Sequence, residues 1–353
     1  MRTGSAGEAD GGPPRGASRH LSRYILGKAV WYLLALAVAL VLNFLLPRLI
    51  PGNPVDALIG QYIRGGSAGQ ATARVYEAFL EEFGLDSSMG HQFVAYIGNV
   101  VRGNLGISFS FYPARVTDLI AQALPWTVAL QLPAILLGWI LGNVLGALAA
   151  YKGGRFDRAF FVGALAVSSI PYYAMAIILL YVLAVVLPVF PAAGGYSFGM
   201  MPEFSAAFIL DLAHHYALPF LSLVLISIGS QAVGMRSMAI YELGTDYVNY
   251  SSAMGVREGF ILRYVFRNAM LPQVTGLALS LGTLVGGALI TELVFSYPGI
   301  GDLLFKAITL NDYPLIQGVT LFIATGVLLA NFLVDVAYGF IDPRIRAVQM
   351  GER

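Results

Sequence analysis

Long apolar runs alternate with polar intervals along most of the chain. The runs lie at about 25–50, 126–150, 159–188, 217–239, 272–295 and 315–340. A helix needs about 20 consecutive apolar residues to cross a hydrocarbon core roughly 30 Å thick. Each run reaches that length, so the pattern predicts an all-α, multi-pass membrane protein with six transmembrane helices.

The polar intervals divide the chain into further segments. Residues 1–23 are rich in Gly, Ser, Pro and Arg and predict a disordered basic tail before a first transmembrane helix at 24–50. This first apolar run is too long for the core of a cleavable signal peptide. Residues 51–124 predict a large loop that contains an amphipathic helix at about 73–83. Residues 125–346 then form a five-helix core, and 347–353 a short tail.

Composition and charge set the expected environment and orientation. The chain is 57% apolar and 12% charged, whereas a soluble domain has about 25% charged residues. The short interval 151–158 contains three basic residues, and basic residues concentrate in cytoplasmic loops. We therefore expect both termini and the polar stretch at 240–271 to be cytoplasmic, and the 51–124 loop to be extracytoplasmic.

The longest polar interval in the second half of the chain lies at 246–275. Four of its residues recur three and four positions apart, which places them on one face of a helix. They are Tyr247, Tyr250, Ser251 and Met254. Gly255 predicts the turn that ends this helix, and Pro272 is a favourable first residue for the next one. A short helix outside the membrane that ends at a glycine indicates a docking element.

Glycine recurs every fourth residue in two of the predicted transmembrane helices. These glycines are Gly138, Gly142 and Gly146 in the second helix and Gly282 and Gly286 in the fifth. Small residues at this spacing let another helix backbone approach closely. The spacing indicates helix packing, and it is also compatible with a fifth helix that slides against a neighbour.

Two acidic residues fall within the predicted spans. Glu292 lies near the extracytoplasmic end of the fifth span and Asp335 near the cytoplasmic end of the sixth. A charge at membrane depth is costly unless it is paired or hydrated. Both residues can be structural, in an ion pair or hydrogen bond. The functional alternative is that Glu292 faces a polar translocation cavity and Asp335 pairs with an arginine of the 246–275 stretch.

Two further features modify the predicted helices. Pro171 lies inside the third apolar run and predicts a kink there. His214 and His215 precede the fourth run, and we expect them to be anchors at the membrane interface.

The sequence lacks the residue patterns of several functional classes. It contains no Cys and four His, with no HExxH motif, so no metal site is expected. It has no GxxxxGK[ST] phosphate-binding loop and no serine nucleophile with a plausible histidine partner. Its net charge of +1 indicates no nucleic-acid partner. We therefore expect a protein that is not an enzyme and binds no cofactor itself.

A series of short motifs runs along the chain from the first predicted helix to the last. They are PGNPVDAL, RGNLGIS, LPWTVAL, SSIPYY, ALPFLSL, GTDYVNYSSAMG, RNAMLPQVT, TELVFSYPGIG, DYPLIQGV and FLVDVAYGFIDPRIR. In this order and spacing they resemble the permeases of bacterial ABC importers in the dipeptide, oligopeptide and nickel group. The 246–275 stretch resembles the so-called EAA loop of that family.

This resemblance implies a type I ABC importer transmembrane domain with a coupling helix. In the family, the first helix of the EAA loop inserts into a groove of a cytoplasmic ATPase subunit and transmits its closure to the membrane helices. The implied contact residues are Tyr247, Tyr250, Ser251, Met254, Gly255, Arg257 and Glu258. Where the general pattern has Glu-Ala-Ala, this chain has Asn249-Tyr250-Ser251, so we expect packing to carry more of the contact.

The resemblance also implies an assembly in the cytoplasmic membrane of a bacterium or archaeon. Its parts are this permease, a second related permease, two ATPase subunits that bind ATP and Mg, and an extracytoplasmic substrate-binding protein. This chain would form half of a pathway for di- or oligopeptides, with oligosaccharides or nickel as alternatives. A secondary transporter, which typically carries midplane ionisable residues, and a membrane-embedded enzyme are the alternatives from other classes.

Overall fold

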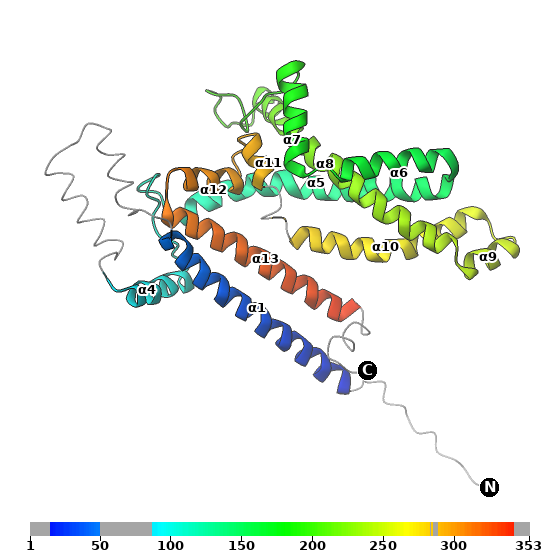
Figure 1. Ribbon diagram of the computed structural model, residues 1–353, viewed down its shortest axis with the longest axis horizontal. Helices are drawn as coiled ribbons and strands as arrows, with labels where there is room; N and C mark the ends of the chain where they lie inside the picture. The colour runs from blue at the N-terminus through cyan, green and yellow to red at the C-terminus, as the bar shows by residue number, and fades with distance from the viewer. Residues whose placement is uncertain (1–14, 50–86, 283, 285–288, 342–353) are drawn as a thin grey trace, which may run out of the picture.

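The computed structural model describes residues 15–49, 87–282, 284 and 289–341, which contain helices and no strand (Figure 1). The helices are α1 (Arg15–Leu49), α4 (Met89–Val101), α5 (Val116–Lys152), α6 (Gly154–Ser168), α7 (Tyr172–Leu180), the π-helix η1 (Tyr181–Val186), α8 (Ala206–Leu243), α9 (Asp246–Ala253), α10 (Glu258–Gly282), α11 (Leu289–Val294), α12 (Ile300–Thr309) and α13 (Tyr313–Ile341). The all-α prediction is confirmed for this part. The amphipathic helix expected at 73–83 lies outside the described residues.

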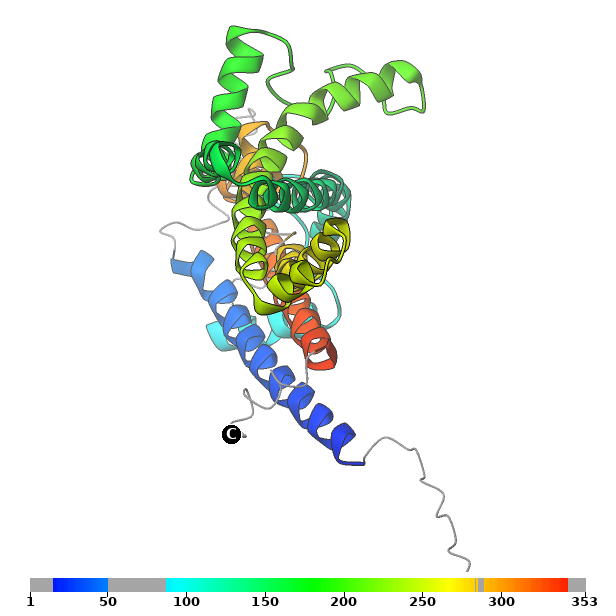
Figure 2. The same ribbon diagram turned by 90° about the vertical axis from the view of Figure 1, so that its right-hand side faces the viewer.

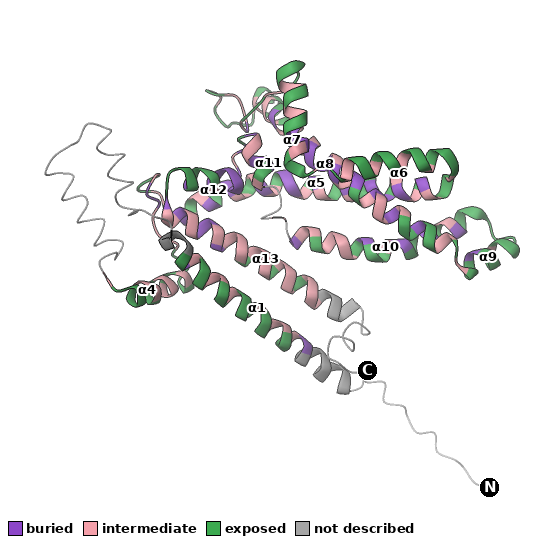
Figure 3. Ribbon diagram, in the orientation of Figure 1, coloured by how far each residue is buried: buried purple, intermediate pink, exposed green. Residues whose placement is uncertain are grey.

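The pair α5 and α8 forms the centre of the molecule, and buried positions gather along it (Figure 3). Gly138, Gly142 and Gly146 all face α8 and are buried. A Cβ at Gly142 would meet the side chain of Gln231, and one at Gly146 would meet the backbone of Ala232. The glycine spacing therefore allows the two backbones to approach more closely than side chains would permit.

The third apolar run forms two helices rather than one kinked helix. α6 and α7 are bent by 94° relative to each other, and Pro171 stands directly before α7 as its N-cap. A proline ring clashes with the preceding turn and lacks the N–H of a helix interior, so α6 cannot continue through it. Figure 1 shows α7 rising away from the line of α5 and α6.

The number of spans is not settled by helix length alone. Within the described residues, four helices are long and apolar enough to cross a membrane, or five if the α6 and α7 pair counts as one span. Within the expected helix at 272–295, α10 covers residues up to Gly282, Leu284 lies in a turn, and α11 covers residues from Leu289. α10 starts at Glu258, so Pro272 lies inside it and does not open it. The six-helix count and the cytoplasmic termini stay predictions.

The first helix packs along the last one and stands apart from the central helices (Figures 1 and 2). α1 begins at Arg15, so the end of the expected disordered tail is helical. The prolines and most glycines of that tail fall in residues 1–14, which leaves 15–23 able to extend the helix. Trp31 of α1 is 71% exposed, as suits a side chain that faces lipid or another subunit.

The loop before α5 is shorter than expected. α5 begins at Val116, inside the predicted 51–124 loop, and that loop also contains α4. The side-chain amide of Asn43 in α1 donates to the hydroxyl of Tyr96 in α4 at 3.0 Å. α4 is therefore attached to the α1 and α13 pair.

Candidate functional site

The polar stretch between α8 and α10 forms a short helix and a tight turn. α9 covers Asp246–Ala253, and Met254 is its C-cap. Gly255 has a φ of 74°, a left-handed conformation that glycine adopts without the Cβ clash of other residues. The turn returns the chain to α10, which begins at Glu258. This geometry matches the helix and turn expected from the sequence.

α9 has one buried side and one exposed side. Val248 is 7% exposed and packs with Val265 of α10 and Leu243 of α8. Tyr250 and Met254 are 69% and 66% exposed. The inner side therefore attaches α9 to two long helices, and the outer side presents two large side chains to whatever lies beyond them.

Tyr247 takes part in the attachment, although its side chain is 37% exposed. Its hydroxyl donates to Glu242 Oε2 of α8 at 2.8 Å, and Asn268 Nδ2 of α10 donates to Tyr247 at 3.2 Å and to Glu242 at 3.3 Å. Burial and the Glu242 carboxylate raise the pKa of Tyr247, so the phenol remains a donor. Ser251 is half-buried, and Tyr247, Tyr250 and Met254 are exposed, so the four residues expected on one helix face lie away from the buried Val248.

Glu258 and Arg257 take different positions at the start of α10. The hydroxyl of Tyr151, near the end of α5, donates to Glu258 Oε1 at 2.8 Å. Arg257 is exposed and forms no ion pair with any described residue. Glu258 thus links α10 to α5, and Arg257 is available to a partner.

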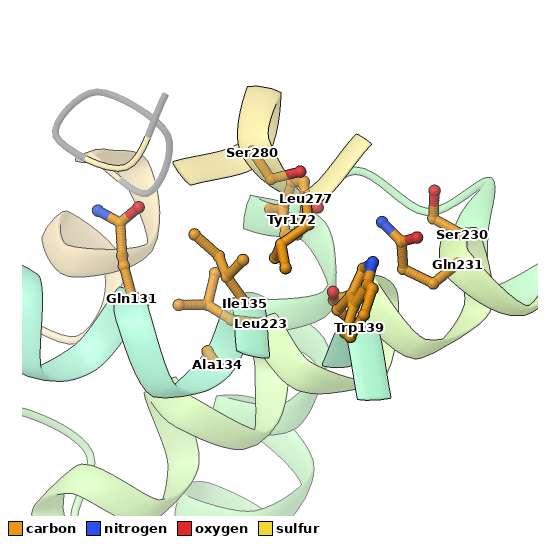
Figure 4. Close-up of a pocket in the computed structure, with 11 residues that line it drawn as sticks. Gln131, Ala134, Ile135, Trp139, Tyr172, Leu223, Ser230, Gln231, Leu277 and Ser280 are labelled. Atoms are coloured by element: carbon orange, nitrogen blue, oxygen red, sulfur yellow. The ribbon is translucent and has the colours of Figure 1, made fainter. Parts of the chain in front are cut away.

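A polar cavity of about 200 Å³ lies between α5, α7, α8 and α10 (Figure 4). Its lining residues are Gln131, Ala134, Ile135, Trp139, Tyr172, Leu223, Ser227, Ser230, Gln231, Leu277 and Ser280. None of them is charged. Gln231 is the lining residue nearest to the end of α8 at Leu243. At 1.5 Å per residue the distance along the helix is about 18 Å.

Two glutamines project from α5 and α8 at opposite ends of this cavity (Figure 4). Gln131 is 4% exposed, and its Nε2 has no hydrogen-bond partner. The side chains of Gln231, Ser227 and Ser230 also form no hydrogen bond with the described part of the chain. Our sequence reasoning considered only charged residues within the apolar runs, and the signal it missed was the amides and hydroxyls there.

Glu292 lies beside the cavity but not in its lining. It is fully buried, and its Oε2 accepts the backbone N–H of Gly301 at 2.7 Å. Thr127 Oγ1 of α5 accepts the N–H of Ile300 at 2.8 Å. Glu292 and Thr127 together satisfy the first N–H groups of α12. This arrangement fits the structural alternative for Glu292.

Asp335 also has a structural partner. Lys28 Nζ of α1 lies 2.8 Å from Asp335 Oδ2, and the Tyr32 hydroxyl donates to the same oxygen at 2.9 Å. In this structure Asp335 pairs with Lys28 and Tyr32 of α1 and not with an arginine of the 246–275 stretch.

The two histidines lie inside α8, not ahead of the helix. His215 is 7% exposed, and its Nδ1 lies 2.9 Å from the carbonyl oxygen of Asp211. His214 Nε2 lies 2.8 Å from the Val189 carbonyl oxygen. His214 therefore holds the segment before α8 against the helix, whereas the contact of His215 lies within α8. Their role as anchors at a membrane interface stays a prediction. Among the described residues, no group of His, Asp or Glu could hold a metal ion.

Of the two glycines at this spacing in the predicted fifth span, the structure describes only Gly282. A Cβ at Gly282 would meet Asn331 at 3.0 Å and Ala330 at 3.5 Å, both on α13. Gly282 therefore lies at the contact between α10 and α13, and Gly286 lies outside the described residues.

Comparison with known proteins places these features in a family. Residues 142–347 match the family model described as "Binding-protein-dependent transport system inner membrane component". A protein named as a peptide permease in Brucella ovis is 37% identical over 329 residues, which cover 92% of this chain and 99% of that protein. The di/tripeptide transport system permease protein DppB of Pseudomonas aeruginosa is 33% identical over 86% of this chain and 93% of its own length.

The glutathione transport system permease protein GsiC of Escherichia coli is 33% identical, with 92% of this chain and 98% of that protein covered. The matched relatives are bacterial, and no archaeal protein is among these three. The chain therefore belongs to the family of inner-membrane permease subunits of binding-protein-dependent ABC importers, and it is not itself an enzyme.

Proposed function

We propose that this chain forms half of the translocation pathway of an ATP-driven importer for di- and oligopeptides. The observation that carries the proposal is that α8 and α10 both hold α9 and line the polar cavity. A movement imposed on α9 from the cytoplasm would therefore reach the cavity through two continuous helices. Relatives named as permeases for peptides, di/tripeptides and glutathione, itself a tripeptide, support peptides as the substrate class.

The rest of the machine consists of separate chains. A second related permease supplies the other half of the pathway, and two ATPase subunits bind ATP and Mg and contact α9 through Tyr250, Met254 and Arg257. An extracytoplasmic binding protein delivers the peptide. ATP binding favours the outward-open arrangement and hydrolysis restores the inward-open one, so the chain works as a two-state element biased from outside.

Reconstitution of the complete importer in proteoliposomes tests this function. We expect uptake of a labelled tripeptide to require the binding protein, both ATPase subunits and ATP. Uptake of maltotriose but not tripeptide would assign the importer to oligosaccharides. Uptake by this chain alone, driven by an ion gradient, would instead identify a secondary transporter and overturn the proposal.

A further inference from the structure

We propose that the cavity between α5, α7, α8 and α10 recognises the main-chain amide groups of a peptide as it crosses the membrane. The inference rests on the proposed peptide-import function and adds where and how the membrane domain contacts its substrate. Recognition of the backbone, which all peptides share, makes this site indifferent to the charge of the substrate's side chains.

The hydrogen-bonding groups of the cavity match those of a peptide unit. A glutamine side chain is an amide with two N–H donors and one carbonyl acceptor. Gln131 and Gln231 present such amides from α5 and α8, with the hydroxyl of Ser230 beside Gln231 (Figure 4). Ser227, another lining residue, lies about one turn before Gln231 on α8. A peptide C=O or N–H can therefore pair with groups that have no partner of their own in the described chain.

Gln131 carries the strongest evidence for a ligand. Its Nε2 is buried and has no hydrogen-bond partner among the described residues, so a peptide carbonyl can become its acceptor. Gln131 lies beside Glu292, whose Oε1 is also unpaired, yet no well-formed hydrogen bond joins Gln131 Nε2 to it. A small rotation of Gln131 would pair it with Glu292 when the cavity is empty, and a peptide would then replace Glu292 as the acceptor.

This exchange keeps binding weak. Exchange of one buried hydrogen bond for another changes the free energy of the site little, because the donor has an acceptor before and after binding. A transport pathway needs sites that a substrate can enter and also leave. The cavity, with a volume of about 200 Å³, has room for several backbone groups of a peptide.

The absence of charge in the lining determines the selectivity. A fixed charge about 4 Å from a substrate charge in a partly hydrated site would change the transport rate of that substrate about tenfold. Acidic and basic peptides would then cross at very different rates. With amides, hydroxyls and apolar groups only, the cavity leaves the choice of side chains to other subunits.

The test introduces a charge into the cavity of the complete importer. Maximal uptake of Ala-Lys-Ala and Ala-Glu-Ala is measured in proteoliposomes with saturating binding protein. For each variant, the rate for Ala-Lys-Ala is divided by the rate for Ala-Glu-Ala. This ratio is then divided by the wild-type ratio, which removes any preference of the binding protein. We expect Gln231→Glu to raise the ratio about tenfold, Gln231→Lys to lower it about tenfold, and Gln231→Met to slow both peptides equally.

Two further variants secure the result. Ser230→Asp also introduces a negative charge into the lining and should raise the ratio as Gln231→Glu does. Ser230 is exposed, so the new charge should leave folding intact. Ser237→Asp places an acidic residue on α8 outside the lining and should leave the ratio unchanged. Peptide uptake by the wild type with an unchanged ratio in both Gln231→Glu and Ser230→Asp overturns this inference alone. A wild type that takes up no peptide overturns the proposed function, and the inference with it.

Discussion

Glu292 is a buried carboxylate whose two oxygens have different surroundings. Oε2 accepts the N–H of Gly301, and Oε1 has no hydrogen-bond partner. The carboxylate also lies so close to Gly299 that a Cβ there would overlap it. The side chain therefore holds the turn between α11 and α12 in place.

Replacing Glu292 separates the structural role from a role in transport. Glutamine keeps one acceptor for Gly301, so we expect Glu292→Gln to assemble and to transport peptide at nearly the wild-type rate. Glu292→Leu leaves the Gly301 N–H unpaired in a buried site, which should cost about 1–3 kcal/mol. A lower melting temperature in detergent for the leucine variant only is the expected result. A glutamine variant that melts normally but has lost uptake would favour a role in the cavity.

For single residues, the sequence showed which side chains are unusual in a membrane helix but not which residues they contact. Asp335 and Glu292 were identified because a charge in an apolar run is conspicuous. Their partners lie on distant segments, Lys28 for Asp335 and Gly301 at the start of α12 for Glu292, and local patterns do not encode such pairings. Gln131 and Gln231 were missed because a neutral amide barely lowers the hydropathy of a long run.

Among the helices, α9 is the element most open to a direct test. Tyr250 and Met254 form its outer side, and burial of a large apolar side chain contributes about 1.5–3 kcal/mol. We expect the double variant Tyr250→Asp with Met254→Asp to reduce co-purification of the ATPase subunits more than tenfold, because two charges would enter an apolar contact. The helices should stay folded, as judged by circular dichroism and the melting temperature.

The matched control places the same charges nearby. Tyr241 and Phe260 are 71% and 53% exposed and lie on α8 and α10 next to α9. The double variant Tyr241→Asp with Phe260→Asp should retain the ATPase subunits. Normal co-purification with both double variants would show that α9 is not the docking helix.

The helix boundaries show where local signals fail. Gly255 and the three- and four-residue spacing were sufficient to predict α9, because both signals act within one turn. The sequence predicts a helix start at Pro272, but α10 continues through it from Glu258. In membrane helices, neighbouring groups can satisfy the backbone that a proline leaves unpaired, so tertiary packing overrides the local preference.

For the whole molecule, the contact between α5 and α8 limits what the chain can tolerate. A Cβ at Gly146 would overlap the backbone of Ala232, which cannot move aside as a flexible side chain could. We expect Gly146→Ala to destabilise the protein by about 1–3 kcal/mol, the usual cost of overpacking. Gly163→Ala in α6, where nothing lies within 4 Å, should be neutral or slightly stabilising. Equal melting temperatures for the two variants would contradict this contact.

The arrangement of the helices was less accessible to the sequence than their existence. Hydropathy identified the long apolar segments, but it could not show that α1 lies apart with α13 or that α7 turns by 94° from α6. Pro171 predicts a break between α6 and α7 but not its angle, and in α1 most apolar side chains face outward, so their pattern does not identify α13 as the neighbour.

The link from α9 to the cavity can be followed in the complete importer with a single reporter. The sequence contains no cysteine, so Ser230→Cys adds one thiol at the cavity. If closure of the ATPase subunits opens the cavity to the outside, a membrane-impermeant maleimide added outside should label this thiol several-fold faster with a non-hydrolysable ATP analogue bound than without it. Ser237→Cys, on the same helix outside the cavity lining, should label at one rate in both states. If adding Tyr250→Asp and Met254→Asp abolishes the difference in labelling rate, α9 transmits the effect of ATP to the cavity. If Ser230→Cys alone is labelled at the same rate with and without the analogue, α8 is not coupled to the ATPase cycle.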